Sequence, residues 1–183
     1  MGLRPTIDQV RNLGMHASHY RWGVQLVKIP ASLGGFGSSD LNLRALSIEP
    51  PTRTIEDTEI NFRGTKIYQH GIITYNPIQL TLHELVDSRT ITMLENWMDS
   101  QWNPDTGAQV PKIENQAEIL LSLLDSQDLV RCTYHLYGAW PTHFDHGGVY
   151  DSVTSDTVKP IVTLRYDKYT YTLNTLILQF RDL

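Results

Sequence analysis

Apolar and polar residues alternate with a period of two along most of this chain. The alternating runs cover residues 20–28, 41–50, 78–82, 119–123, 130–136, 158–173 and 176–180. In the first run, Trp22, Val24 and Leu26 fall on one side. Successive side chains of a β-strand point to opposite faces of the sheet, so this period predicts strands that are buried on one face. Segments rich in Gly, Pro, Asp and Ser separate the runs, which favours antiparallel pairing.

One segment departs from this period and predicts a helix. The apolar residues at helical spacing are Ile91, Leu94, Trp97, Met98 and Trp102. Ser88 or Asp87 can cap the start of the helix, and Asn103-Pro104-Asp105 would end it. We therefore expect a mainly β fold, an antiparallel sandwich or small barrel with a single flanking helix.

Length and charge narrow the organisation and the function. The 183 residues suit a single domain over residues 1–183, with 40% hydrophobic residues for its core. A net charge of -5 and scattered basic residues disfavour nucleic-acid binding. The single cysteine, Cys132, cannot form an internal disulfide. No apolar run reaches the roughly 20 residues of a membrane span, and no secretory signal is expected.

The segment from Thr52 to Asn76 is interpreted as a long excursion or a hairpin. It mixes β-forming residues with charges and is interrupted by Gly64 and Gly71. The charged residues that we regard as candidates for contact with another protein surface are Arg53, Glu56, Asp57, Glu59, Arg63 and Lys66. Such a mixture suits a wet interface with complementary charge.

A second feature is the motif Tyr137-Gly138-Ala139-Trp140-Pro141-Thr142. We interpret it as a turn at the end of a strand. Pro141 would stop ladder pairing, and Gly138 would allow a close backbone approach. Trp140 would bury a large apolar area at the end of the sandwich; the alternative is an internal core tryptophan.

Candidate catalytic and metal sites are weak. His143, Asp145 and His146, with His135 upstream, could in principle hold a divalent metal. A turn flanked by proline also collects His and Asp for hydrogen bonding, and this reading is preferred. No phosphate-binding loop, nucleophile elbow or activated cysteine is found. We expect no cofactor, no metal and no enzymatic activity.

The order of the motifs resembles the tail tube proteins of contractile-tailed bacteriophages, relatives in fold of the type VI secretion tube protein. The matching segments are WGVQLVKI at 22–29, LRALSIEP at 43–50, NFRGTKIYQHG at 61–71, TYNPIQLTLHE at 74–84, RTITMLENWMDSQW at 89–102, YHLYGAWPT at 134–142 and the strand at 158–169. The resemblance covers roughly residues 20–170. It leaves an N-terminal segment at 1–19 and an extension at 171–183 without counterparts.

The resemblance implies a structural role. Six copies would form a ring, and rings would stack into a hollow virion tube through which DNA passes without specific binding. The long loop at 50–76 would reach the next ring, and the turn with Gly138, Trp140 and Pro141 would lie at the sandwich end or at a subunit border. The implied partners are further copies of the chain, sheath, tape measure, baseplate and tail terminator proteins, with assembly in the host cytoplasm and no membrane partner. An acidic or neutral channel lining would repel phosphate.

Two alternatives stay open. The unmatched segments at 1–19 and 171–183 also suit a specialised ring, such as a baseplate tube initiator or a tail terminator. A monomeric β module that binds a ligand through the loop at 143–146 is the third reading.

Overall fold

The computed structural model describes residue 7 and residues 19–33, 37–103, 105–149, 152–153 and 155–174. Seven strands form one antiparallel sheet. They are β1 (Trp22–Lys28), β2 (Ala45–Ile48), β5 (Ile78–Leu82), β6 (Ala117–Leu124), β7 (Val130–Asp145), β8 (Ile161–Arg165) and β9 (Lys168–Leu173). The remaining strands, β3 (Arg53–Phe62) and β4 (Thr65–Tyr75), form a separate hairpin. The predicted class, mainly antiparallel β with one principal helix, is confirmed.

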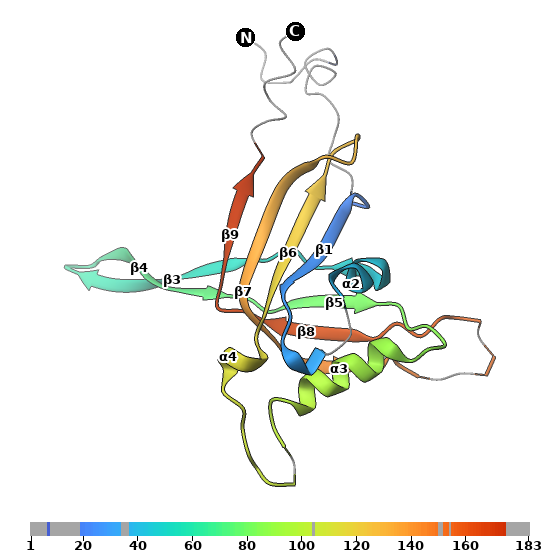
Figure 1. Ribbon diagram of the computed structural model, residues 1–183. Coiled ribbons are helices and arrows are strands. Elements are labelled where there is room, and N and C mark those ends of the chain that lie inside the picture. Colours follow the sequence, from blue (N-terminus) through green and yellow to red (C-terminus); the bar gives the residue numbers. More distant parts are fainter. Residues whose placement is uncertain are drawn as a thin grey trace.

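The sheet is open and divides into two layers that share β7. The strand order is β1-β6-β7-β8-β5-β2, and β9 also pairs with β7. The first half of β7 pairs with β6 and β9, whereas the half from Trp140 onward pairs with β8. Figure 1 shows β1, β6, β7 and β9 running upright and β5 and β8 running across below them. We call these two layers the upright layer and the crossing layer.

The core lies between the two layers and the principal helix, α3 (Arg89–Asp99). Each layer contributes residues at alternate positions, as the period-two pattern predicts. Core residues from the strands include Val24, Leu26, Leu80, Leu82, Ile119, Leu136, Val162 and Leu164, and α3 adds Met93, Leu94 and Trp97. The Trp97 indole N–H donates to the Asn115 carbonyl at 2.8 Å, so this buried polar group is satisfied.

The corner between the layers is built around Gly138. Its φ of +66° lies in the left-handed region, and an added Cβ would come within 3.0 Å of the Asp167 Cγ. The Asp167 N–H donates to the Tyr137 carbonyl at 2.9 Å. Asp167 lies in the connection between β8 and β9. This connection and strand β7 therefore pass from one layer to the other at the same place.

The expected turn at the end of a strand was wrong. The motif at 137–142 lies inside β7, which continues to Asp145. Pro141 is fully buried and aligns with Leu164 of β8, with a register shift before His143. The Gly-aromatic-Pro pattern therefore marks a change of layer instead of a strand terminus, because bulges and bends absorb a missing amide donor.

An ionic clip holds the start of α3. The Arg44 guanidinium donates to both Asp87 carboxylate oxygens, at 3.1 and 2.6 Å, and to the Thr90 hydroxyl at 3.0 Å. The Glu84 carboxylate accepts from the Thr90 and Ile91 amides, at 3.4 and 2.6 Å. Of the two expected capping residues, Ser88 has a φ of 52° and makes no side-chain cap bond, whereas the Asp87 carboxylate accepts from the Arg89 amide at 3.2 Å. Asp87 and Glu84 together therefore satisfy amides of the first helical turn.

The expected strand through Leu41, Leu43 and Ala45 was wrong at its start. Residues Ser38–Arg44 form helix α2, and only Ala45–Ile48 form β2. Leu41 is buried while Leu43 is 80% exposed, because these positions point in different directions on a helix. The Asp40 carboxylate accepts from the Gly37 amide at 3.1 Å and caps this helix.

The expected single run at 158–173 is two strands, β8 and β9, in different layers. Tyr166 lies buried at the break between them. The short helices η1 (Ala31–Leu33) and α4 (Lys112–Asn115) complete the fold. The expected strand at 176–180 and most of the segment at 1–19 lie outside the described residues.

We expect Gly138→Ala to destabilise the fold by about 1–3 kcal/mol through backbone strain, with further loss from crowding against Asp167. Gly107→Ala is the matched control, because Gly107 has a φ of +68° but no heavy atom within 4 Å of an added Cβ. Urea unfolding of both variants would measure the two costs. Equal losses would show that the Asp167 contact contributes nothing.

We also expect an acid-dependent contribution from the clip. The Arg44 guanidinium lowers the pKa of the Asp87 carboxyl. A depressed folded-state pKa gives stability that is present above the unfolded value of about 3.9 and is lost as pH falls through the folded value. Asp87→Asn should therefore be less stable at neutral pH and show a weaker loss of stability on acidification. Melting temperatures across this pH range test this, with exposed Asp99→Asn as the control.

Candidate functional site

The most exposed feature is the hairpin arm, residues 53–75. Every residue of β3 is exposed, and β4 is exposed except for Gly71 and Tyr75, which are half-buried. Figure 1 shows the arm projecting sideways from the sheet. Strands of this length span about 33 Å, so the arm extends well beyond the body of the subunit. The sequence expectation of a hairpin here is confirmed.

Polar bonds and tyrosine rings fix the root of the arm. The Asn76 backbone amide donates to the Thr52 carbonyl at 3.1 Å, and the Tyr166 hydroxyl donates to the same carbonyl at 3.3 Å. The ring of Tyr75 lies 6.0 Å from that of Tyr166 and 5.6 Å from that of Tyr169. Burial raises the pKa of Tyr166 to about 12, so its phenol remains a neutral donor at physiological pH.

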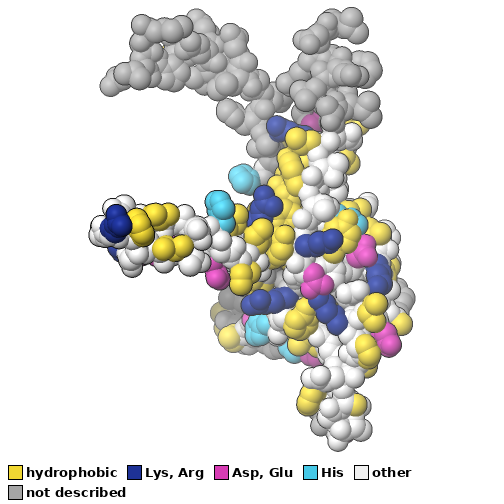
Figure 2. Space-filling view, turned by 90° about the vertical axis from the view of Figure 1, so that its left-hand side faces the viewer, with side chains coloured by type: hydrophobic (Ala, Val, Ile, Leu, Met, Phe, Trp, Pro, Cys, Tyr) yellow, Lys and Arg dark blue, Asp and Glu magenta, His cyan; other side chains and the backbone are white. Residues whose placement is uncertain are grey.

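The arm exposes an unusual number of apolar side chains. They are Ile55, Ile60, Phe62, Ile67, Tyr68, Ile72 and Ile73, each at least 40% exposed. Figure 2 shows hydrophobic side chains along the arm and on the body beside its root, with basic side chains at its far end. Exposed apolar surface of this kind is typical of sites that contact another protein chain.

The strand register sorts these side chains onto two faces. Ile60 lies opposite Ile67 near the turn, on the same face as Phe62. Ile55 lies opposite Ile73 on the other face, near the root. A bulge beside Gly71 separates the two halves; an added Cβ there would lie 2.7 Å from the Glu56 carbonyl oxygen. We call Ile60, Phe62, Arg63 and Ile67 the arm tip.

Four of the predicted contact charges have partners within the subunit. Lys66 pairs with Glu59 at 2.9 Å. The Arg53 guanidinium lies 6.0 Å from the Tyr169 ring centroid, and that of Arg63 lies 5.3 Å from the Phe62 centroid. Glu56 and Asp57 are exposed on β3. Whether these residues contact a second ring stays a prediction.

The upright layer has two border strands. Among the described strands, β1 pairs with β6 and β9 pairs with β7, so each is paired on one side. The Asn42 side-chain oxygen accepts from the Val24 amide at 3.0 Å and covers one donor of the β1 edge. Strand edges of this kind serve as templates for pairing with another chain.

The outer face of the upright layer is mainly polar, although Leu120 also lies on it, and it is mixed in charge. It carries Gln25, Ser122, Thr133, Thr170 and Thr172 at alternate strand positions. Among the described residues of these strands, three basic residues, Lys28, Arg131 and Lys168, share this face with one acid, Glu118, which lies 3.1 Å from His135. Among the described residues, this face therefore carries more basic than acidic side chains, and the acidic or neutral lining of a channel stays a prediction.

A groove lies where β7 leaves the corner. Its lining includes Gln101, Trp102, Gln109, Val110, Lys112 and Trp140, and its volume is about 270 Å³. Trp140 is half-buried, so it is neither a core tryptophan nor a free one. A bridge between Trp102 and Gln109 shapes the outer wall. We call this the corner groove; Trp102 was expected on the helix stripe and instead lies beyond α3, 50% exposed.

The histidines do not converge on a metal site. His146 pairs with Glu95 of α3 at 2.5 Å, and His135 pairs with Glu118 on a different strand. The Asp145 carboxylate accepts from the Gly147 and Gly148 amides, which lower its pKa. The part of the chain that the structure describes contains no cluster of three His, Cys, Asp or Glu residues suited to a metal ion. No helix among the described residues is long and apolar enough to cross a membrane.

Comparison with known proteins shows the fold. No protein-family model matches the sequence, and no curated protein does. Among solved structures, a chain of the anti-feeding prophage (AFP) baseplate is 16% identical with a TM-score of 0.65, over 89% of this chain and 99% of that chain. A chain of the PVC sheath/tube terminator, from an extracellular contractile injection system, is 18% identical with a TM-score of 0.65, over 87% and 99%.

A chain of the PVC sheath-tube complex is similar to the same degree, 19% identical with a TM-score of 0.64, over 93% of this chain and 99% of that chain. These matches extend over nearly the whole length of the other proteins. The chain therefore has the fold of tube and terminator proteins of contractile injection systems, and the fold relationship predicted from the sequence is confirmed.

Proposed function

We propose that this chain is a structural subunit that forms rings in the tube of a contractile tail or injection system. The observation that carries the proposal is the combination of an open sheet with two border strands and an arm whose apolar residues are exposed. In a monomer, the border strands would lack a pairing partner on their outer side, and the apolar residues of the arm would stay exposed to water. Edge-to-edge joining of upright layers would close the borders, and the arm would contact a further copy.

In its finer form the proposal gives six copies to a ring and places the stacked rings inside a sheath. The structures with a similar fold come from assemblies described as a baseplate, a sheath/tube terminator and a sheath-tube complex, which supports this setting. Tape measure, baseplate and terminator proteins would be the further partners. In a phage virion the channel would carry DNA during ejection. The subunit's part is mechanical, with no catalytic step.

A second candidate is a specialised ring at one end of the tube. It is favoured by the similarity to chains from a baseplate and from a tube-terminating cap, the latter 15% identical with a TM-score of 0.65 over 87% of this chain and 93% of that chain. A terminator or initiator ring would use the same border strands for closure. It would differ in stacking on one face only.

Assembly of the purified protein tests the proposal. We expect sedimentation analysis to show rings as the protein concentration rises, and negative-stain microscopy to show rings stacked into tubes. Rings that never stack beyond one junction would favour the specialised ring. A monomer that persists at high concentration would contradict both candidates, since the strand edges would then have no partner.

The charges of the arm give a second test. We expect Arg63→Glu combined with Lys66→Glu to shorten the tubes while the melting temperature stays unchanged, because the arm contributes no buried core residue. An exposed pair contributes only about 0–1 kcal/mol, but about 0.5 kcal/mol repeated six times becomes roughly 3 kcal/mol per ring junction.

Salt and a control variant complete the test of the arm charges. Tubes should shorten as salt rises, because charges are screened beyond about 10 Å at 0.1 M. Lys159→Glu, an exposed basic residue away from the arm, is the control and should leave tube length unchanged. Normal tubes from the double variant would remove these charges from the interface. A collapsed melting temperature would instead show that these charges contribute to the stability of the subunit itself.

A further inference from the structure

We propose that the Asn42 side chain is an autoinhibitory cap on the edge of β1. It occupies the Val24 amide in the free subunit and leaves when a strand of another copy pairs with β1. This inference rests on the proposed function, because it concerns the closing of a ring through the border strands. The observation that carries it is the hydrogen bond from the Val24 amide to the Asn42 side-chain oxygen, 3.0 Å long. Asn42 belongs to α2, which Figure 1 shows beside β1.

The ladder between β1 and β6 shows which backbone groups of β1 face the open edge. The Leu124 amide donates to the Arg21 carbonyl at 3.0 Å, so these two residues form a hydrogen-bonded pair. Such pairs alternate along an antiparallel ladder, so Gly23 and Gln25 also bond to β6. The backbone groups of the residues between them point away from β6. These residues are Trp22, Val24 and Leu26. Asn42 therefore covers the central donor of the open edge.

The open edge of β9 has a matching arrangement. The Asn174 amide donates to the Arg131 carbonyl at 2.9 Å, so the same alternation turns every second residue of β9 outward. The outward residues are Tyr169, Tyr171 and Leu173. Their side chains lie on the core-facing side of the upright layer, as do those of the outward residues of β1. Residues that exchange hydrogen bonds across an antiparallel pair have side chains on the same face, so β9 of one copy fits β1 of another.

A strand that pairs with β1 would compete with Asn42 for one hydrogen bond. It would bring a backbone carbonyl to the Val24 amide, at the position that the Asn42 oxygen occupies. A backbone amide has a single N–H, so only one of the two acceptors can take a well-aligned bond from it. In the free subunit the cap protects the β1 edge against pairing with unrelated chains, which is a hazard of exposed strand edges.

The surroundings of Asn42 suit a side chain that can be released. The buried Leu41 and the bonds from Arg44 to Asp87 hold α2 in place. Asn42 itself is exposed, so its carboxamide can bond to water after it leaves the edge. Gly23 provides room for its approach, because an added Cβ there would lie 3.3 Å from the Asn42 oxygen. Release therefore requires only rotation of one side chain.

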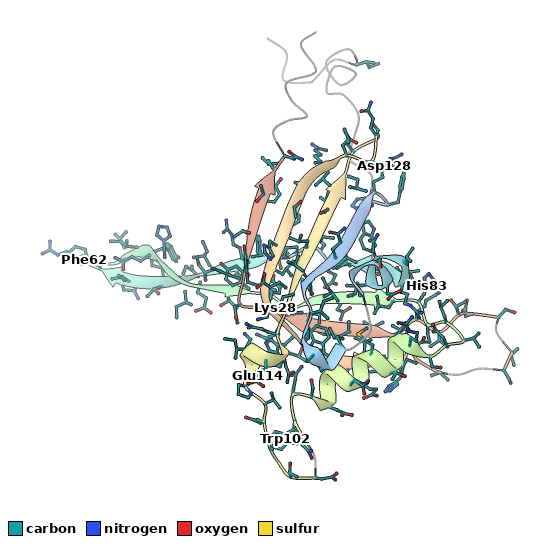
Figure 3. The ribbon with its side chains drawn as sticks, viewed as in Figure 1. Lys28, Phe62, His83, Trp102, Glu114 and Asp128 are labelled. Atoms are coloured by element: carbon teal, nitrogen blue, oxygen red, sulfur yellow. The ribbon has the colours of Figure 1, made fainter. Side chains whose placement is uncertain are left out.

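The two ends of β1 are fixed independently of Asn42. The Arg21 guanidinium donates to the Asp128 carboxylate at 2.7 Å, and the Lys28 ammonium donates to the Ile113 carbonyl at 3.4 Å. Figure 3 labels Asp128 at the turn between β6 and β7 and Lys28 at the end of β1. Together with the β6 ladder, these contacts keep β1 in place when the cap leaves. Removal of the Asn42 side chain should thus free the edge without unfolding the strand.

Removal of the cap should promote ring formation. The net contribution of one neutral hydrogen bond corresponds to roughly a two- to tenfold change in an equilibrium constant. We expect Asn42→Ala to form rings at a protein concentration about two- to tenfold lower than native protein requires, as measured by sedimentation. Asn42→Asp should require a higher concentration, because a carboxylate accepts more strongly. Asn103→Ala is the control, since the exposed Asn103 also accepts from backbone amides, but in the loop after α3.

Hydrogen exchange at the Val24 amide tests whether the cap leaves. We expect this amide to exchange faster in the Asn42→Ala monomer than in the native monomer, because its acceptor is gone. In rings of the same variant it should be protected again, since a carbonyl of β9 replaces the lost acceptor. The Gln25 amide, which faces β6, is the internal reference and should be protected in every form. A Val24 amide that stays unprotected in these rings would show that no strand reaches it and would overturn the inference.

The outcomes separate the inference from the function on which it rests. If Asn42→Ala forms rings at the same concentration as native protein, or needs a higher one, the inference is wrong and the proposed function stands. If neither protein forms rings at any concentration, the proposed function fails and the inference fails with it. If Asn42→Ala does not fold, as its melting temperature would show, the direction of the change in Asn42→Asp decides the inference.

Discussion

The fold depends on the contact between Gly138 and Asp167 at the corner of the sheet. A strand of sixteen residues can serve two layers only if its backbone bends sharply in the middle. Gly138 permits that bend, and the absence of a side chain leaves room for the Asp167 carboxylate. Asp167 in turn ties the connection between β8 and β9 to the same point through the Tyr137 carbonyl. Without this contact, the connection between β8 and β9 would not be held against β7 at the point where β7 bends.

The arm and the groove both follow from the corner. Tyr166, adjacent to Asp167, bonds to the carbonyl of Thr52 and fixes the root of the arm. On the other side, Trp140 leaves the corner half-buried and forms one wall of the groove, while Lys112 of α4 reaches back to Asp167. The arm, which would contact another copy, and the groove are therefore anchored to the most constrained part of the subunit, which limits their movement on the core.

Local pattern predicted most of the elements, and long-range contacts explain where it failed. The strands and α3 follow from their apolar periods, and the arm was expected as a hairpin. The alternation of Leu41, Leu43 and Ala45 is typical of a strand. The segment is nevertheless helical, because Asp40 caps it and the buried Arg44 bonds to Asp87. No glycine or proline marks the break at Tyr166, because the corner contact with Gly138 specifies it from elsewhere in the chain.

The candidate surfaces were harder to predict for the same reason. Sequence drew attention to the charges of the arm, but only the register shows that Glu59 and Lys66 lie on one face and pair with each other. Trp102 and Trp140 are far apart in sequence and meet only because β7 turns the corner above the loop after α3. No local spacing carries that information.

The magnitudes of the interactions indicate which residues of the arm would contribute most to the proposed contact between copies. Exposed ion pairs contribute about 0–1 kcal/mol, and several of the arm's charges already have partners within the subunit. Burying a phenylalanine contributes about 1.5–3 kcal/mol. An isolated two-stranded hairpin is only marginally stable in water, so burial of its apolar tip would also keep the arm ordered. In the proposed contact, the apolar tip would thus be the larger source of affinity, and the charges would act mainly to orient it.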